Sequence, residues 1–204
     1  LGGTHTFPLD SNFFTVPATI RGGISGMISS QGNLIVGKEN ALYSVSGDLD
    51  DLTITIDKIT EGGIGIACHN ASRDTPRGSI FLSKVGFYMI ANGYHLLEVG
   101  AQINKIFTDS QYQSSLILQL RRSFAFNVER QEKYMCFIPT ESGTGTGKYA
   151  NGTSTVQVYD YYHDAWGDYT GLNMGGGITV MDEELYWLSR QDDSVLTVTG
   201  RLWK

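Results

Sequence analysis

The residues of this chain that could carry chemistry are scattered rather than grouped in a known catalytic motif. Its histidines show none of the paired spacings that metal sites use, and they stand at His5, His69, His95 and His163. There is no Gly-x-Ser-x-Gly elbow, and no cysteine lies in a catalytic context. We therefore expect structural or surface histidines, no bound metal or cofactor, and no enzymatic activity.

Two further patterns could hold a phosphate or a reactive thiol, and both favour a structural interpretation. The glycine-rich run 143–148 has three residues before its Gly-Lys pair, where a phosphate-binding loop has four, and Tyr149 follows instead of Ser or Thr. Cys68 and Cys136 are too few for a disulfide scaffold and too far apart for a zinc site. We expect both cysteines to be small buried side chains.

Acidic residues cluster in three predicted turns. The clusters are Asp48, Asp50 and Asp51; Asp182, Glu183 and Glu184; and Asp192 with Asp193. Like charges so close together repel, and a turn exposes them to water, which predicts solvated loop tips. The alternatives are a calcium site, although no cluster shows the ligand loop that ends in Glu, and a pair of glycosidase carboxylates.

The most unusual patch is an aromatic run between Tyr159 and Tyr169. Side chains alternate along a strand, so Tyr159 and Tyr161 are expected on one face and Tyr162 on the other. One interpretation is an outer strand whose turn places Trp166 in a gap between two sheets. The second is a partner interface, because Tyr and Trp supply large contact areas at little entropic cost; its residues would be Tyr159, Tyr161, Tyr162 and Trp166. A platform for stacking sugars is the third.

Composition limits the class of protein. The 204 residues are 41% hydrophobic and 18% charged, which is typical of a folded globular chain. Twenty-five glycines against 4 prolines favour tight turns and β-hairpins. The net charge of −6 gives no positive field that would gather nucleic acid, and no apolar run is long enough to cross a bilayer.

One motif recurs along the chain: an apolar run rich in β-branched and aromatic residues, a polar turn, and a second such run. Its turns lie near residues 39, 85, 130 and 183, and a further strand is expected over 52–56, 94–99, 155–160 and 194–199. Repeats of about 40 to 50 residues are typical of propeller blades. We predict an all-β fold made of β-propeller-like repeats, each an antiparallel sheet of three or four strands.

A sheet with two apolar faces cannot bury both alone, and stacking like sheets around an axis supplies the missing contacts. We expect one such domain over residues 1–204, either complete or cut from a longer chain. Near its start, Phe7, Phe13, Phe14 and Val16 are apolar enough to complete a sheet with the C-terminal strand or to pack on a neighbour.

Two segments interrupt the repeat. Val99, Ile103, Ile106 and Phe107 fall at helical spacing after Gly100, which predicts one short helix across the outside or one end of the propeller. Residues 113–120 either continue as a helix or begin a strand. The run 141–153 is rich in Gly, Thr and Ser, which predicts an exposed loop inside the third unit.

Several of these runs resemble the β-propeller segment of tail or nozzle proteins in the virions of short-tailed bacteriophages. In that family a Gly-Cys-like strand and a Phe-Leu-Ser hairpin with Gly and Tyr precede a short helix. The similar stretches are Gly65–Ala71, Gly78–Ile90, Val99–Phe107, Lys133-Tyr134, and Val158-Tyr159-Asp160 with Trp166. The chain is far shorter than a typical tail nozzle subunit.

The resemblance implies a structural virion component that forms a ring at the tail or close to the portal. Its partners would be other copies of itself and neighbouring tail proteins, without a membrane, after assembly in the cytoplasm of the bacterial host. DNA would pass through the lumen during ejection without specific binding, which suits an acidic wall. Identical copies joined head to tail close into rings.

The alternative is a carbohydrate-binding or glycan-cleaving β-propeller that acts on host surface polysaccharide. Such a protein needs polar groups, and for cleavage carboxylates, that converge near the axis. A virion building block instead needs apolar and aromatic patches on an outer face.

Overall fold

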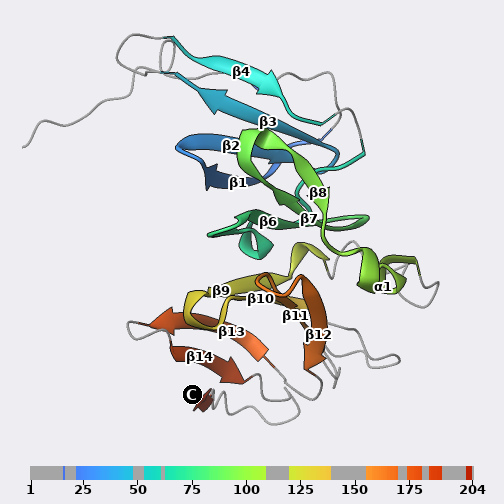
Figure 1. The fold of residues 1–204 in the computed structure, drawn as a ribbon, viewed down its shortest axis with the longest axis vertical. Helices are drawn as coiled ribbons and strands as arrows, with labels where there is room; N and C mark the ends of the chain where they lie inside the picture. Colours follow the sequence, from blue (N-terminus) through green and yellow to red (C-terminus); the bar gives the residue numbers. More distant parts are fainter. Residues whose placement is uncertain are drawn as a thin grey trace, which may run out of the picture.

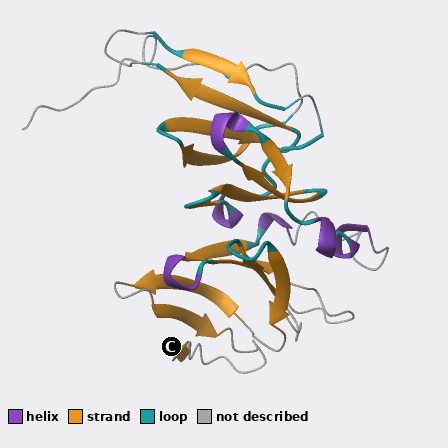
Figure 2. Ribbon diagram, viewed as in Figure 1, coloured by secondary structure: helices purple, strands orange, loops and turns teal. Residues whose placement is uncertain are grey.

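The computed structural model describes residues 16, 22–47, 53–60, 63–108, 120–138, 155–169, 174–180, 184–189 and 201–203. This part of the chain is mostly β and contains one short α-helix (Figures 1 and 2). Three sheets have four strands each and a fourth has three, and all pairings are antiparallel. For the described residues, the prediction of a mainly β fold built from repeated antiparallel sheets is confirmed.

The strands pair in the order in which they occur along the chain. Sheet 1 contains β1 (Ile24–Ser30), β2 (Asn33–Lys38), β3 (Ala41–Ser46) and β4 (Thr55–Lys58). Sheet 2 contains β5 (Arg73–Thr75), β6 (Gly78–Ser83), β7 (Gly86–Ile90) and β8 (Leu96–Glu98). Sheet 3 contains β9 (Phe124–Val128), β10 (Lys133–Ile138), β11 (Thr155–Asp160) and β12 (Ala165–Tyr169). Sheet 4 contains β13 (Met174–Val180), β14 (Glu184–Ser189) and β15 (Arg201–Trp203).

The repeat is more regular than the hairpins suggested. The first strands of the four sheets begin at Ile24, Arg73, Phe124 and Met174, so successive sheets start 49, 51 and 50 residues apart. The predicted turns near 39 and 85 join the second and third strands of their sheets, whereas those near 130 and 183 join the first and second. The predicted turns are unevenly spaced because they belong to different hairpins of their sheets. The first strands β1, of seven residues, and β5, of three residues, were not predicted from the sequence.

The sheets follow one another along the long axis of the molecule (Figure 1). Contacts between sheets include those between first strands, because β1 contacts β5, β5 contacts β9, and β9 contacts β13. Sheets 1 and 4 lie at opposite ends of the stack in Figure 1. The described residues thus form a series of stacked antiparallel sheets, and they do not close into a complete propeller.

Apolar side chains fill both gaps that flank sheet 2. Alternate residues of its strands face opposite sides. Phe81, Tyr88 and Ile90 pack toward sheet 1, where Ile35 and Leu42 meet them. The alternating partners on the other side are buried against sheet 3, and they are Ile80, Leu82, Phe87 and Met89. Sheet 2 is therefore apolar on both faces, as expected for a layer inside a stack.

Ile66, in the connection between sheets 1 and 2, explains two glycines in the strands of sheet 1. Its side chain is fully buried, and its backbone N–H donates to the carbonyl of Lys38 at 3.0 Å. A Cβ atom at Gly26 would lie 2.6 Å from Cγ2 of Ile66, and one at Gly37 would lie 2.4 Å from Cδ1. Glycine inside a strand often marks such a close approach.

Helical structure is confined to short segments. The four-residue helix α1 (Lys105–Thr108) follows a 3-10 turn at Ala101–Ile103, and Phe107 packs edge-on against Phe87 at 5.7 Å between ring centroids. This confirms the predicted short helix. Further 3-10 turns lie at His69–Ala71, Asn92–Tyr94 and Glu129–Gln131. Leu120 is helical, whereas residues 113–119, 141–153 and 194–199 lie outside the described part.

Polar contacts fasten neighbouring sheets at both ends of their strands. Glu39, in the β2–β3 turn, accepts from Lys84 in the β6–β7 turn at 2.6 Å and also from Arg121, just before sheet 3. At the opposite strand ends, Gln31 donates to the carbonyl of Ala91 and accepts from the backbone N–H of Gly93. These contacts fix how the sheets are oriented on one another.

Among the described residues, no helix is long and apolar enough to span a membrane.

Gly37→Ala is expected to destabilise the protein by about 1–3 kcal/mol, because the added methyl group overlaps Ile66 in a packed core. Ile66→Ala alone should cost about 2–5 kcal/mol. The double variant should lose less than the sum of the two, since each change relieves the other. Urea unfolding measures all three. Gly167→Ala, where nothing lies within 4 Å of the added atom, is the control, and additive losses would contradict the proposed overlap.

Glu39→Gln should lower stability at pH 7 by about 1 kcal/mol, as expected for the loss of two partly exposed ion pairs. The bonds to Lys84 and Arg121 lower the pKa of Glu39. Its ionised form therefore stabilises the fold above the ordinary glutamate pKa, and this contribution is lost as the pH falls through the lowered value. Urea midpoints of wild type and variant should converge in acid. Asp168→Asn, on exposed β12, is the control, and a pH-independent gap would disprove the role of the charge.

Candidate functional site

The aromatic run lies on β11, the turn that follows it, and β12. The structure distributes the four predicted interface residues between core and surface. Tyr159 and Tyr161 are buried, at 2% and 3% exposure, and Trp166 is partly buried. Tyr162 is 66% exposed. The four residues therefore do not form one exposed surface, and Tyr162 is the member that a partner could reach directly.

Trp166 closes the gap between sheets 2 and 3. Its ring stacks on Tyr159 at 4.9 Å and lies 4.8 Å from the ring of Phe87 in sheet 2, measured between centroids. Its indole N–H donates to the carbonyl of Val99 at 2.5 Å. An indole buried on one side, with its N–H satisfied, is a strong anchor between layers. This geometry agrees with the interpretation that Trp166 fills a gap between two sheets.

The turn after β11 is fastened by its own side chains. Asp160 accepts from the backbone N–H groups of Tyr162 and His163, at 3.1 and 2.9 Å, and lies 2.9 Å from Nδ1 of His163. These bonds to His163 lower the pKa of Asp160. Asp164 has a left-handed backbone, with φ of 53°, and accepts from the hydroxyl of Tyr159 at 2.6 Å. Tyr162 is consequently held on a well-defined turn.

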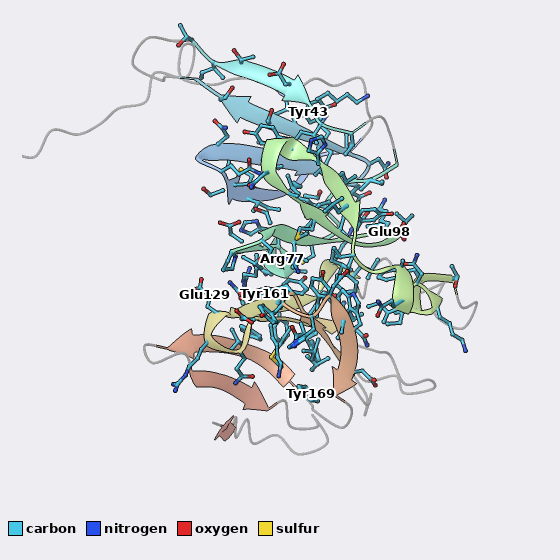
Figure 3. All side chains as sticks on the ribbon, viewed as in Figure 1. Tyr43, Arg77, Glu98, Glu129, Tyr161 and Tyr169 are labelled. Carbon is cyan, nitrogen blue, oxygen red and sulfur yellow. The ribbon has the colours of Figure 1, made fainter. Side chains whose placement is uncertain are left out.

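A second connection ties this turn to sheet 2. The guanidinium of Arg77, in the β5–β6 turn, donates to the backbone carbonyl of Tyr161, and Figure 3 shows the two residues side by side. The N–H of Tyr161 donates to the carbonyl of Glu132 in sheet 3 at 3.0 Å. Tyr161 thus joins three turns that are far apart in the sequence.

Both cysteines are free and buried, as predicted. Burial raises the pKa of Cys136 to about 12 and also raises the pKa of Cys68. The Cys68 thiol lies 3.1 Å from the carbonyl oxygens of Arg121 and Ser123. Because the thiolate is the reactive form of cysteine, burial and the raised pKa both disfavour reaction of these two thiols at neutral pH.

The acidic clusters of the sequence cannot be placed in a site. Asp48, Asp50, Asp51, Asp182, Glu183, Asp192 and Asp193 all lie outside the described residues, and Glu184 begins β14. Of the histidines, His5 also lies outside them, while His69 accepts from the backbone N–H of Met27 at 3.2 Å. Within the described residues, no three histidine, cysteine or acidic side chains are grouped to hold a metal.

Sequence reasoning missed the charged contact centred on Glu39. A signal was present, because Glu39 and Lys84 occupy the same turn of successive repeats and carry opposite charges. Only the correct strand assignment makes those two turns equivalent, however. Arg121 precedes the third repeat and could not have been assigned to the contact from spacing.

Comparison with known proteins finds no family model and no curated protein sequence that matches this chain.

Trp166→Ala is expected to lower stability by about 3 kcal/mol, because it removes a large ring from the gap between sheets 2 and 3. Trp166→Phe should cost about 1 kcal/mol, since the ring contacts remain and the hydrogen bond to Val99 is lost. Thermal and urea unfolding measure both. Tyr169→Ala, at an exposed position of the same strand, is the matched control. A loss below about 1 kcal/mol for the alanine variant would place Trp166 outside the core.

Proposed function

We propose that this chain is a structural, non-enzymatic building block of propeller-like architecture. Its proposed place is the virion tail or nozzle of a short-tailed bacteriophage, where several copies form a ring close to the portal and line the path of DNA. The virion setting depends on the resemblance of residues 65–71, 78–90 and 99–107 to that family. The architecture adds support of its own.

The observation that carries the proposal is the contact between first strands of consecutive sheets. In a propeller, the first strand of each blade lies next to the axis, and the later strands extend outward. Here β1 contacts β5, β5 contacts β9, and β9 contacts β13, while each sheet continues through its later strands in chain order. This arrangement supports the proposal that the sheets are consecutive blades of a propeller.

The polar side chains described above hold neighbouring sheets together, which favours a structural role for the chain. Glu39, Gln31 and Arg77 each connect one sheet to the next, through a charged contact, two amide hydrogen bonds and a bond to a carbonyl. Fixed turns at both ends of the strands offer neighbouring copies a rigid surface. Head-to-tail contacts between such copies close into a ring, and the net charge of −6 would not retain DNA in the lumen.

Tyr162 is the residue we assign to contacts between copies or with neighbouring tail proteins. It is the most exposed of the large hydrophobic side chains described, and the bonds of Asp160 fix the turn that carries it. A rigid exposed tyrosine loses little conformational entropy on binding, which is why tyrosine is frequent among residues that dominate interfaces. Trp166 and the buried tyrosines act indirectly, by supporting this turn.

Light scattering after size exclusion, together with electron microscopy, tests the proposal on the full-length chain, alone and with its virion neighbours. We expect a ring-sized complex. Tyr162→Ala should weaken that complex without changing thermal stability, and Leu97→Ala, at a 46% exposed site in sheet 2, is the matched control. A chain that stays monomeric in both conditions overturns the ring. Polysaccharide hydrolysis by that monomer would favour the glycan-cleaving alternative.

A further inference from the structure

The turn between β7 and β8 carries an asparagine that is followed directly by glycine. Within the described residues this pair is Asn92 and Gly93, and both are exposed. Gly93 has φ of 72°, a left-handed backbone that glycine adopts at no steric cost. The turn thus combines a side-chain amide, a following residue without a side chain, and access to water.

An asparagine in this setting can react with the backbone of the next residue. The Gly93 nitrogen attacks Cγ of Asn92, a C–N bond forms, and Nδ2 leaves as ammonia with the proton that the Gly93 nitrogen gives up. The product is a succinimide ring. Water then opens either ring carbonyl, which leaves aspartate or, when the main chain runs through Cγ, isoaspartate. The reaction consumes only water, and a side chain on the following residue would hinder it, whereas glycine has none.

Gln31, in the β1–β2 turn of sheet 1, holds the attacking nitrogen. Its Oε1 accepts from the N–H of Gly93 at 3.2 Å, and its Nε2 donates to the carbonyl of Ala91 at 2.8 Å. These bonds restrain the chain on both sides of Asn92, and the Gly93 N–H must leave Gln31 before its nitrogen can attack. Both bonds are exposed, so the contact opens by local fluctuation and does not need global unfolding.

The imidazole of His95 lies beside the same glycine. A Cβ atom at Gly93 would be 3.5 Å from Cδ2 and 3.6 Å from Nε2 of His95. A ring nitrogen in this position can take the proton from the Gly93 nitrogen, directly or through one water, and return it to the departing ammonia. The N–H of Ala91 donates to the carbonyl of His95 at 2.8 Å. This bond closes the turn and keeps His95 close to the reacting atoms.

We propose that Asn92 is a site of spontaneous deamidation and that the contact between sheets 1 and 2 controls its rate. While Gln31 holds Gly93, the amide persists, and when the contact opens, His95 assists ring closure. Isoaspartate adds an extra carbon to the main chain before Gly93, which moves the Gly93 N–H away from Oε1 of Gln31. The modification therefore weakens the contact that restrains it. This inference does not depend on the proposed virion role.

Peptide mass spectrometry of the full-length chain, incubated folded in mildly alkaline buffer, tests the site. Conversion of the amide to an acid raises the mass of the peptide that contains Asn92, and chromatography separates its aspartate and isoaspartate forms. We expect isoaspartate to accumulate at Asn92 severalfold faster than at Asn70, an exposed asparagine followed by Ala71. Asn92→Gln, whose longer side chain closes the ring far less readily, should abolish the product. Conversion at Asn92 no faster than at Asn70 would overturn the site.

Variants of Gln31 test the control by the sheet contact. Gln31→Met keeps the length of the side chain and removes both hydrogen bonds, so it should raise the rate at Asn92 about threefold or more. Gln31→Glu, the matched control, keeps an acceptor for the Gly93 N–H and should react more slowly than the methionine variant. Equal rates in wild type and Gln31→Met would overturn the control by Gln31.

Two further measurements separate the contact from the chemistry. In urea, where no contact between sheets exists, wild type and Gln31→Met should react at the same rate, and a difference that persists there would contradict the proposed restraint. His95→Gln should lower the rate severalfold in the folded chain, and thermal unfolding checks that each variant is folded. An unchanged rate in folded His95→Gln would overturn the assistance by the imidazole.

Discussion

Each sheet whose two sides are both described has two apolar faces, and a four-stranded sheet cannot bury both faces by itself. Sheet 2 shows the consequence directly, with Phe81 and Ile90 packed toward sheet 1 and Phe87 and Leu82 toward sheet 3. Covering both faces requires another sheet on each side. The serial stack and the repeat of about 50 residues both follow from this requirement.

Close packing of such layers constrains the residues that pass between them. The connection between sheets 1 and 2 runs through the interface, and Ile66 fits there because Gly26 and Gly37 have no side chains. Its neighbour Ala67 donates a backbone hydrogen bond to Leu82 in sheet 2 at 2.8 Å. The connection is thus part of the core, which explains why glycines occur at positions of sheet 1 where a strand would otherwise favour β-branched residues.

Interactions between layers also account for the aromatic run. Tyr159 and Trp166 lie opposite each other on β11 and β12, and they face Phe87 on the neighbouring sheet. Most of the aromatic surface that suggested an interface is therefore buried between two sheets, where it holds the sheets together. What remains for a partner is Tyr162, on a turn that Asp160 stabilises.

Local patterns in the sequence were sufficient for the elements whose cause is local. Alternating apolar residues and polar turns identify strands such as β6, β7 and β10, and the spacing of Ile103, Ile106 and Phe107 identifies the short helical region, because both depend on neighbours within a few residues. Burial of the two cysteines was predicted from their number and spacing, which fit neither a disulfide scaffold nor a zinc site. The number of sheets also follows from the repetition.

Tertiary structure decided which strands belong together, which of the tyrosines are exposed, and which charges meet. β5 has only three residues, and its place is set by pairing with β6 and contact with β9, which no local pattern reveals. Tyr161 and Tyr162 are adjacent in the sequence and differ in exposure because a neighbouring sheet covers only one side of their turn. Glu39 meets Arg121 across 82 positions of the chain, and such contacts depend on how whole layers are stacked, since a charged side chain by itself favours no particular partner.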